Sequence, residues 1–273
     1  MNSRRIHRTL LIGIGAAVMT AAVSPAVTLV KNGKSSYSIC LGADASPSEK
    51  RAAQELRRFL EEMSGARLGI VADDDSARGD LILVGNSRVL QRLGLNIPFD
   101  SLGPEGFALK TSGPHLVIAG GRQRGTMYGV YTLLDRLGCR WFTPEVSRIP
   151  KKATLTIGPL DETHKPAFEY REVFFTEAFD KDWAARNRTN GNSARLDEST
   201  GGKVQYYPFV HSFYRMIPPE KYFKDHPEYF SLIDGQRRVE RGQLCLTNPQ
   251  VLRLGIEAVE RWIQEHPEAT ILS

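Results

Sequence analysis

Cysteine is scarce in this sequence: the 273 residues include only Cys40, Cys139 and Cys245. No two of them form a Cys-x-x-Cys pair and no lipobox is present, so the chain carries no local thiol redox motif and no lipid-attachment motif. An odd number of cysteines leaves two interpretations open. The thiols are buried and free, or one of them pairs with a partner beyond the C-terminus.

Nucleotide, metal and serine-hydrolase motifs are also missing. Gly120–Thr126 holds two glycines before a predicted helix, but it lacks both the lysine of a P-loop and the spacing of a dinucleotide fingerprint. No Gly-x-Ser-x-Gly elbow occurs, and His211, His226 and His266 are too far apart for the spacing of a zinc site. The sequence therefore predicts no cofactor and no metal.

A long hydrophobic run occurs only near the N-terminus. Three arginines precede the apolar residues 10–19, and Ser24-Pro25-Ala26 fits a small-x-small cleavage site. The run is shorter than the roughly 20 residues that span a membrane. We interpret residues 1–26 as a signal peptide, with Ser3-Arg4-Arg5 a weak twin-arginine signal, and expect a periplasmic or extracellular protein without a stable membrane span.

Excess charge of one sign is small once this segment is removed. Cleavage after Ala26 removes three arginines and no acidic residue, so the formal net charge falls from +5 to +2. A nearly neutral protein has no electrostatic basis for nucleic-acid binding. Hydrophobic residues make up 41% of the chain and charged residues 25%, so it can bury a sizeable core.

Residues 27–158 alternate between strand and helix signals. Residues 46–49 read Ser-Pro-Ser-Glu, an N-cap with a first-turn proline and a capping-box glutamate, for a helix that ends at Gly65. A second helix begins near Gly125 and ends at Gly138. Strands are expected at 37–41, 68–71, 81–84, 107–110, 116–120 and 153–157. The pattern predicts an α+β domain, a sheet with two helices on one side.

Residues 159–165 are polar and predict a linker, after which a different rhythm begins. Strand signals at Phe168–Phe175 and Tyr206–His211, a hairpin turn at Asp234-Gly235, a helix after Asn248 and a last strand follow one another. This order predicts the first part of a (β/α)8 barrel over residues 166–273. A closed barrel needs roughly 250 residues, so we expect the chain to be a fragment.

Two residues of this region are candidates for ligand binding. Arg171 lies among apolar and aromatic neighbours, where a charge is costly unless it is paired or contacts a ligand. A salt bridge with Glu169 or Glu172 is the structural alternative. His211 follows an aromatic run at a predicted strand end, where barrel active sites lie, and a capping or core histidine is the alternative.

The loop after the first of these strands combines aromatic and polar side chains. Trp183, Asn187 and Arg188 would suit a sugar, because aromatic rings stack on pyranose faces while amide and guanidinium groups bind hydroxyls. An ordinary exposed loop would have a similar composition. Glycoside hydrolysis requires paired carboxylates, and no spacing singles out a pair, so the catalytic residues stay unknown.

Several longer stretches resemble a known bacterial family. The resemblance is carried by Gly125–Leu134, Gly138–Glu145, Trp183–Arg188, Tyr222–Phe230 and Gln243–Pro249. They resemble domain-of-unknown-function family 4838, whose N-terminal domain is related to those of α-glucuronidases (glycoside hydrolase family 67) and β-hexosaminidases (family 20). The resemblance extends over nearly the whole chain after the predicted signal peptide.

The resemblance implies a small α+β domain packed on a catalytic barrel that acts on oligosaccharides or polysaccharides. The turn at Gly120–Thr126 would then be an architectural joint, with Arg140–Phe142 directed toward the barrel. Arg171 matches a hexosaminidase arginine that holds sugar hydroxyls, and the acid and base would lie beyond Ser273. The expected function is an exported glycoside hydrolase, with a non-catalytic carbohydrate-binding protein as the alternative and the oligomeric state open.

Overall fold

The computed structural model describes residues 26–74 and 77–273. The predicted signal peptide therefore lies, except for Ala26, outside the described residues. Across the described ranges, no helix combines the length and the apolar character that crossing a membrane requires.

A six-stranded mixed sheet is the centre of the N-terminal region. The strand order is β10-β5-β6-β4-β2-β3, with β2–β3, β2–β4 and β4–β6 parallel and the other two pairs antiparallel. The strands are β2 (Ser38–Leu41), β3 (Gly69–Ala72), β4 (Leu81–Val84), β5 (Phe107–Ser112), β6 (His115–Gly120) and β10 (Asp161–His164). β10 lies inside the segment expected as a linker, so that segment completes the sheet.

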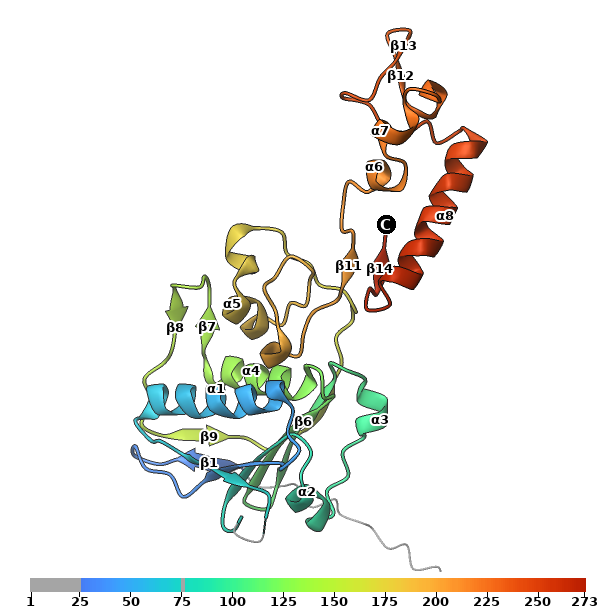
Figure 1. Ribbon diagram of the computed structural model, residues 1–273. Helices are drawn as coiled ribbons and strands as arrows, with labels where there is room; N and C mark the ends of the chain where they lie inside the picture. The colour runs from blue at the N-terminus through green and yellow to red at the C-terminus, as the bar shows by residue number, and fades with distance from the viewer. Residues whose placement is uncertain (1–25, 75–76) are drawn as a thin grey trace, which may run out of the picture.

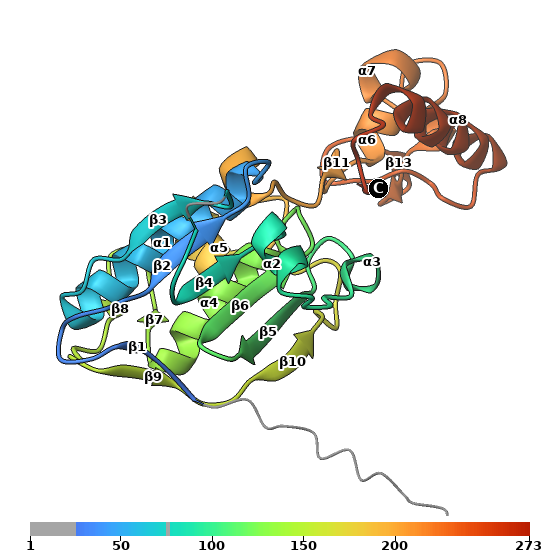
Figure 2. The same cartoon turned by 90° about the horizontal axis from the view of Figure 1, so that it is seen from below.

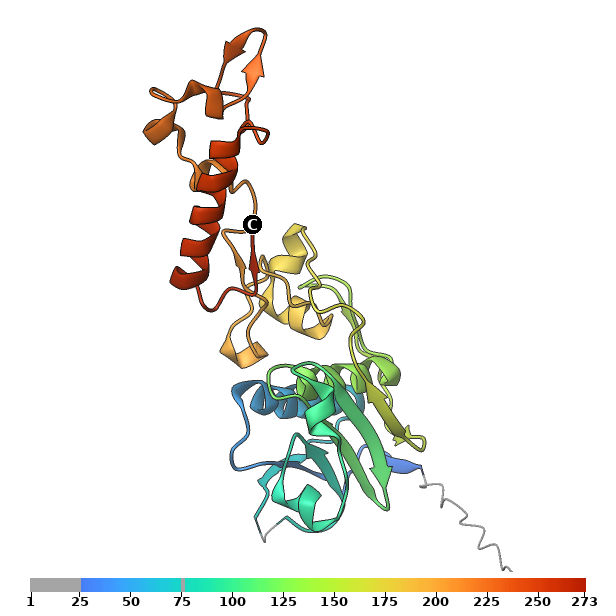
Figure 3. The same cartoon turned by 90° about the vertical axis from the view of Figure 1, so that its right-hand side faces the viewer.

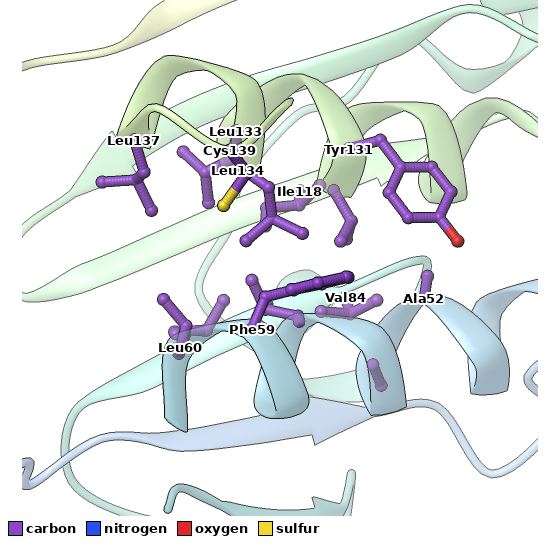
Figure 4. Close-up of a cluster of buried hydrophobic side chains, with 14 of the residues drawn as sticks. Ala52, Phe59, Leu60, Val84, Ile118, Tyr131, Leu133, Leu134, Leu137 and Cys139 are labelled. Atoms are coloured by element: carbon purple, nitrogen blue, oxygen red, sulfur yellow. The ribbon is translucent and has the colours of Figure 1, made fainter. Parts of the chain in front are cut away.

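Two long helices cover one face of this sheet, as the sequence predicts. α1 (Pro47–Ser64) begins with the expected capping box and ends at Gly65 in the left-handed conformation, and α4 (Gly125–Leu137) ends at Gly138 in the same way. Figure 4 shows Phe59 and Leu60 of α1 directed toward Leu134 and Leu137 of α4. This interface forms the main hydrophobic core.

The opposite face of the sheet is also covered, which the sequence does not predict. The short helices α2 (Arg88–Arg92) and α3 (Phe99–Leu102) bury Leu81, Leu83 and Val117 against a second core. β4 is therefore buried along its whole length, which explains its uninterrupted apolar sequence. The prediction of helices on one side only was incomplete.

Two further strand pairs of the N-terminal region lie outside the six-stranded sheet. β1 (Val27–Val30) pairs antiparallel with β9 (Leu155–Ile157), and β7 (Arg140–Trp141) pairs antiparallel with β8 (Ser147–Arg148). The strand expected at 153–157 is therefore present, but it does not join the main sheet.

Residues 166–205 are mostly irregular and pack beside α1 and α4 (Figure 1). They include α5 (Lys181–Arg186) and 3-10 turns at Thr176–Phe179 and Glu198–Thr200. The prediction of a strand at Phe168–Phe175 was wrong. The Arg171 amide donates to the Asn190 side chain instead of to a neighbouring strand, and a strand without a partner leaves its polar groups unsatisfied.

Residues 206–273 project away from the sheet as an arm (Figures 1, 2 and 3). The arm contains β11 (Tyr206–Tyr207), α6 (Phe213–Met216), α7 (Pro219–Tyr222), a 3-10 turn (Pro227–Tyr229), β12 (Leu232–Ile233), β13 (Gln236–Arg237), α8 (Pro249–Glu265) and β14 (Ile271–Leu272). The expected hairpin at Asp234-Gly235 and the helix after Asn248 are present. β11 and β14 are parallel. One parallel pair does not establish a barrel, so the barrel stays a prediction.

Candidate functional site

The turn at Gly120–Thr126 is packed tightly against two other segments. A Cβ at Gly121 would collide with the Gly103 carbonyl, and one at Gly125 would collide with the Gly106 carbonyl. Gly201, which belongs to residues 166–205, lies against the Gln123 carbonyl in the same manner. Only glycine allows such close backbone approach. This turn therefore joins the N-terminal domain to residues 166–205.

A buried carboxylate, Glu105, lies at the centre of this joint. Its Oε1 accepts from Arg124 Nε at 2.6 Å and from Asn190 Nδ2 at 2.8 Å, and its Oε2 accepts from Arg171 Nη1 at 2.7 Å. The side chain is 8% exposed. Burial acts to raise the pKa of Glu105, but the bonds from Arg171 and Asn190 and the two positive charges outweigh it and bring the pKa below the ordinary value.

Arg171 is held by this network rather than by its sequence neighbours. Its Nε donates to the Arg188 carbonyl at 2.9 Å, and its Nη1 donates to the Phe168 carbonyl at 2.7 Å as well as to Glu105. Its Nη2 lies 3.5 Å from the Tyr128 hydroxyl. The ion-pair partner is therefore neither Glu169 nor Glu172, and four of the five guanidinium N–H groups are engaged.

A second set of charged groups joins α1 to α5. Arg186 Nε donates to Glu55 Oε2 at 2.9 Å, and Arg51 Nη2 donates to Asp182 Oδ1 at 2.7 Å. Burial acts to raise the pKa of Asp182, but the bond and the charge from Arg51 bring it below the ordinary value. The N-terminal domain and residues 166–205 thus share two ion-pair networks.

Asn187 and Arg188 form the C-terminal cap of α5. The Arg188 amide donates to the Ala185 carbonyl at 3.1 Å and the Thr189 amide to the Ala184 carbonyl at 3.0 Å, with Arg188 at φ +59°. This is the hydrogen-bond pattern of a Schellman motif. Asn187 Nδ2 donates to the Trp141 carbonyl at 3.2 Å, which ties the cap to the N-terminal domain.

Trp183 lies on the other side of α5, beside an exposed aromatic group. Its Nε1 donates to the Phe142 carbonyl at 3.0 Å, and its ring meets Phe175 edge-on at 5.5 Å. Phe142 and Phe175 are exposed. Trp141 points the other way, into the core beside Phe59. The expected direction of Arg140–Phe142 therefore applies to its backbone carbonyls and not to the Trp141 ring.

His211 lies apart from the other candidate residues. It is exposed and has a φ of +57°, and Phe209 nearby has a φ of +89°. Such backbone conformations are uncommon for residues other than glycine. It lies shortly after β11 in the sequence, near the start of the C-terminal arm.

The structure thus brings Arg171, Asn187 and Arg188 together around one cavity, whose lining includes neither Trp183 nor His211. These three line one side of a cavity of about 350 Å³ between α4 and the cap of α5. Sequence reasoning missed Glu105, which organises Arg171. No sequence signal marks Glu105, because its partners lie 19, 66 and 85 positions away.

Three acidic residues near α5 have hydrogen-bond partners, and that of Asp182 is Arg51. Glu172 accepts from the Tyr170 hydroxyl at 2.6 Å and from the Ser193 amide, and Asp180 caps α5 through the Trp183 amide. None of the described residues form a group of three or more metal-ligating side chains. The three cysteines, all described, are free; Cys40 and Cys139 are buried, and burial raises the pKa of each to about 11.

Solved glycosidase structures are among those that are similar to part of this chain. A GH115 4-O-methyl-α-glucuronidase with specificity for decorated arabinogalactans is 24% identical, with a TM-score of 0.42 over 53% of this chain and 19% of its own. The GH20 β-N-acetylhexosaminidase of Streptomyces coelicolor A3(2) is 18% identical, with a TM-score of 0.40 over 62% of this chain and 32% of its own. The chain thus spans about a fifth to a third of the length of these structures.

No curated protein matches the chain, but two family models do. Residues 25–133 match the Glycosyl hydrolase family 67 N-terminus, and residues 141–273 match the Domain of unknown function (DUF4838). The boundary between the two matches falls between residue 133 in α4 and residue 141 in β7. These two matches confirm the family resemblance of the sequence.

Proposed function

We propose that this protein is an exported glycoside hydrolase-like protein that acts on oligosaccharides or polysaccharides. The observation that carries the proposal is the match of residues 25–133 to the N-terminal domain of a glycoside hydrolase family. The sequence of residues 1–26 supports export to the periplasm or the extracellular space.

The joint explains how an N-terminal domain would contribute to such an activity. Two ion-pair networks, which include Arg171–Glu105 and Arg186–Glu55, and the close approach of Gly201 to the Gln123 carbonyl hold it against residues 166–205. A domain fixed in this way positions the loops that follow it. We assign no catalytic acid or base, because Glu172 and Asp180 accept local hydrogen bonds and Asp182 pairs with Arg51.

The alternative is a carbohydrate-binding protein without catalysis. The exposed rings of Phe142 and Phe175 beside Trp183 favour it, because exposed aromatic faces stack on sugars. This proposal predicts saturable glycan binding that weakens when Trp183 is replaced by alanine.

Turnover distinguishes the two proposals. The natural full-length protein would be incubated with aryl glycosides and with uronic-acid oligosaccharides, and glycan binding would be measured by calorimetry on the same preparation. Hydrolysis of any of these substrates supports the hydrolase. Binding without hydrolysis supports the alternative, and a folded protein that neither binds nor cleaves any saccharide contradicts both.

A further inference from the structure

The cavity beside Arg171 is lined by basic residues and by no carboxylate, although Arg171 pairs with Glu105, which is not among the lining residues. The basic residues of the cavity are Lys165, Arg171, Arg188 and His164, the last of which is bonded to Glu162. Its uncharged polar residues include Thr132 and Asn187, and none of its lining residues is acidic. Its volume of about 350 Å³ falls within the range of small-molecule sites. The cavity lies between the N-terminal domain and residues 166–205, away from β11 and His211.

Two of these cations lack partners. Within the part of the chain that the structure describes, neither Lys165 nor the Arg188 side chain forms a hydrogen bond or an ion pair. Arg171 keeps one Nη2 N–H group free after its bonds to Glu105, the Phe168 and Arg188 carbonyls and Tyr128. The neighbouring arginines Arg124 and Arg186, by contrast, are both paired with buried carboxylates.

The backbone at Arg188 is a second, independent observation. Arg188 occupies the position after the helix end in the cap of α5, with φ +59°. Glycine is the usual residue there, because a side chain is disfavoured in the left-handed conformation. An arginine at a position where the local backbone favours glycine indicates a use for its side chain, and that side chain lines the cavity.

The polar groups of the cavity suggest what accompanies the anion. Both Asn187 Nδ2 hydrogens are engaged, with the Trp141 and Trp183 carbonyls, so its Oδ1 is left to accept a hydrogen bond. The partly buried Thr132 hydroxyl offers a further polar contact. A hydroxylated body next to an oxyanion would satisfy both kinds of group.

We propose that this cavity binds a small hydroxylated ligand through a carboxylate, sulfate or phosphate group, held by Arg188, Lys165 and the free N–H of Arg171. The proposal does not rest on glycosidase activity. The cavity lies where the N-terminal domain meets residues 166–205.

Calorimetry on the whole chain tests the proposal with four probes of one sugar body: glucuronate, glucose 6-sulfate, glucose 6-phosphate and neutral glucose. We expect at least one anionic probe to bind, more weakly at higher salt, and glucose to bind at least about tenfold more weakly. The three anionic probes identify which oxyanion the cavity prefers.

Arg188→Gly is the decisive variant, because its effects on binding and on folding point in opposite directions. It should weaken anion binding at least about tenfold while the melting temperature stays the same or rises, since glycine suits the cap. Arg241→Gly is the matched control: Arg241 also has a positive φ, of +57°, but lies in the arm. Its binding should equal that of the wild type, and Lys165→Gln should weaken binding as well.

Three results would overturn the proposal. They are the absence of binding by all anionic probes at millimolar concentration, equal binding of glucose, and an Arg188→Gly variant that binds as the wild type does. Loss of binding in Arg241→Gly to the same extent would also count against the cavity. None of these outcomes depends on whether the protein hydrolyses glycosides.

Discussion

Helices α1 and α8 have nearly equal lengths, 18 and 17 residues, and both are amphipathic, yet they lie in very different surroundings. α1 buries Leu56, Phe59 and Leu60 between the sheet and α4. α8 buries only Val251, Ala258 and Trp262, and its apolar residues Leu252, Ile256 and Ile263 are between 50% and 63% exposed. An apolar stripe therefore predicts a helix, but the rest of the fold decides whether the stripe is covered.

The same contrast separates the N-terminal domain, together with residues 166–205, from the arm. The N-terminal domain has a core on each face of its sheet, and buried ion pairs hold residues 166–205 against it. The arm has a core of five buried residues, Ile217, Tyr229, Phe230, Leu244 and Val251. We infer that most of the stability of the chain resides in the first region, because buried apolar area is the main stabilising term.

Removing the charge of Glu105 should destabilise the contact between the N-terminal domain and residues 166–205. Glu105→Gln leaves Arg124 and Arg171 without their carboxylate, and removing one partner of a buried ion pair costs about 3–5 kcal/mol. The free energy of unfolding from urea titration measures the effect. Glu162→Gln is the control, because its ion pair with Arg136 is partly exposed and should contribute less than about 1 kcal/mol. Equal losses of unfolding free energy in both variants would contradict a special role for Glu105 at the joint.

Identical substitutions in α1 and α8 sharpen the comparison of the two helices. Leu56→Ala opens a cavity in the core and should cost about 2–5 kcal/mol. Leu252→Ala, at a residue that is 63% exposed, should change the free energy of unfolding by less than about 0.5 kcal/mol. A large effect at Leu252 would show that the exposed face of α8 is covered in solution.

Two adjacent glycines test how closely the regions approach each other. Gly201 and Gly202 have φ values of +75° and +71°, but a Cβ on Gly201 would collide with the Gln123 carbonyl while one on Gly202 meets no atom within 4 Å. Gly202→Ala should therefore cost about 1 kcal/mol for its backbone alone. Gly201→Ala should cost about 2–4 kcal/mol, because overpacking is added. Thermal unfolding of the two variants side by side measures the difference, and similar values would refute the close contact.

Acid should weaken the joint before it affects the cores. The pKa of Glu105 is depressed in the folded state, so its contribution is complete above the ordinary carboxyl value of 4.5 and is lost as the pH falls through the folded-state pKa. The stability difference between the wild type and Glu105→Gln should be constant near neutral pH and shrink below pH 4.5. A difference that persists unchanged to acid unfolding would contradict this.

Local signals in the sequence predicted much of the N-terminal domain. The capping box at Ser46 and the glycines that end α1 and α4 act within a few residues, so the helix bounds followed from them. Gly129 within α4 lies close to β6, since a Cβ there would lie 2.9 Å from Ile118 Cγ2.

The errors concern features that depend on distant partners. Phe168–Phe175 has strand-like composition, but no strand lies beside it to pair with. β10 is polar, and it becomes a strand because β5 offers a free edge. The roles of Glu105 and of the unpaired cations at the cavity arise only from the packing of one region on the other, so the sequence could not show them.

Hydrogen exchange on the wild type and on Glu105→Gln tests most directly whether the joint holds the two regions together. The amides of Arg195 and Val204 are bonded within residues 166–205, to the Phe179 and Asn190 carbonyls. We predict that both lose protection in the variant while β4, β6 and α8 keep theirs. Unchanged protection at Arg195 and Val204, or an equal loss throughout the chain, would contradict the central claim that Glu105 fastens this segment to the N-terminal domain.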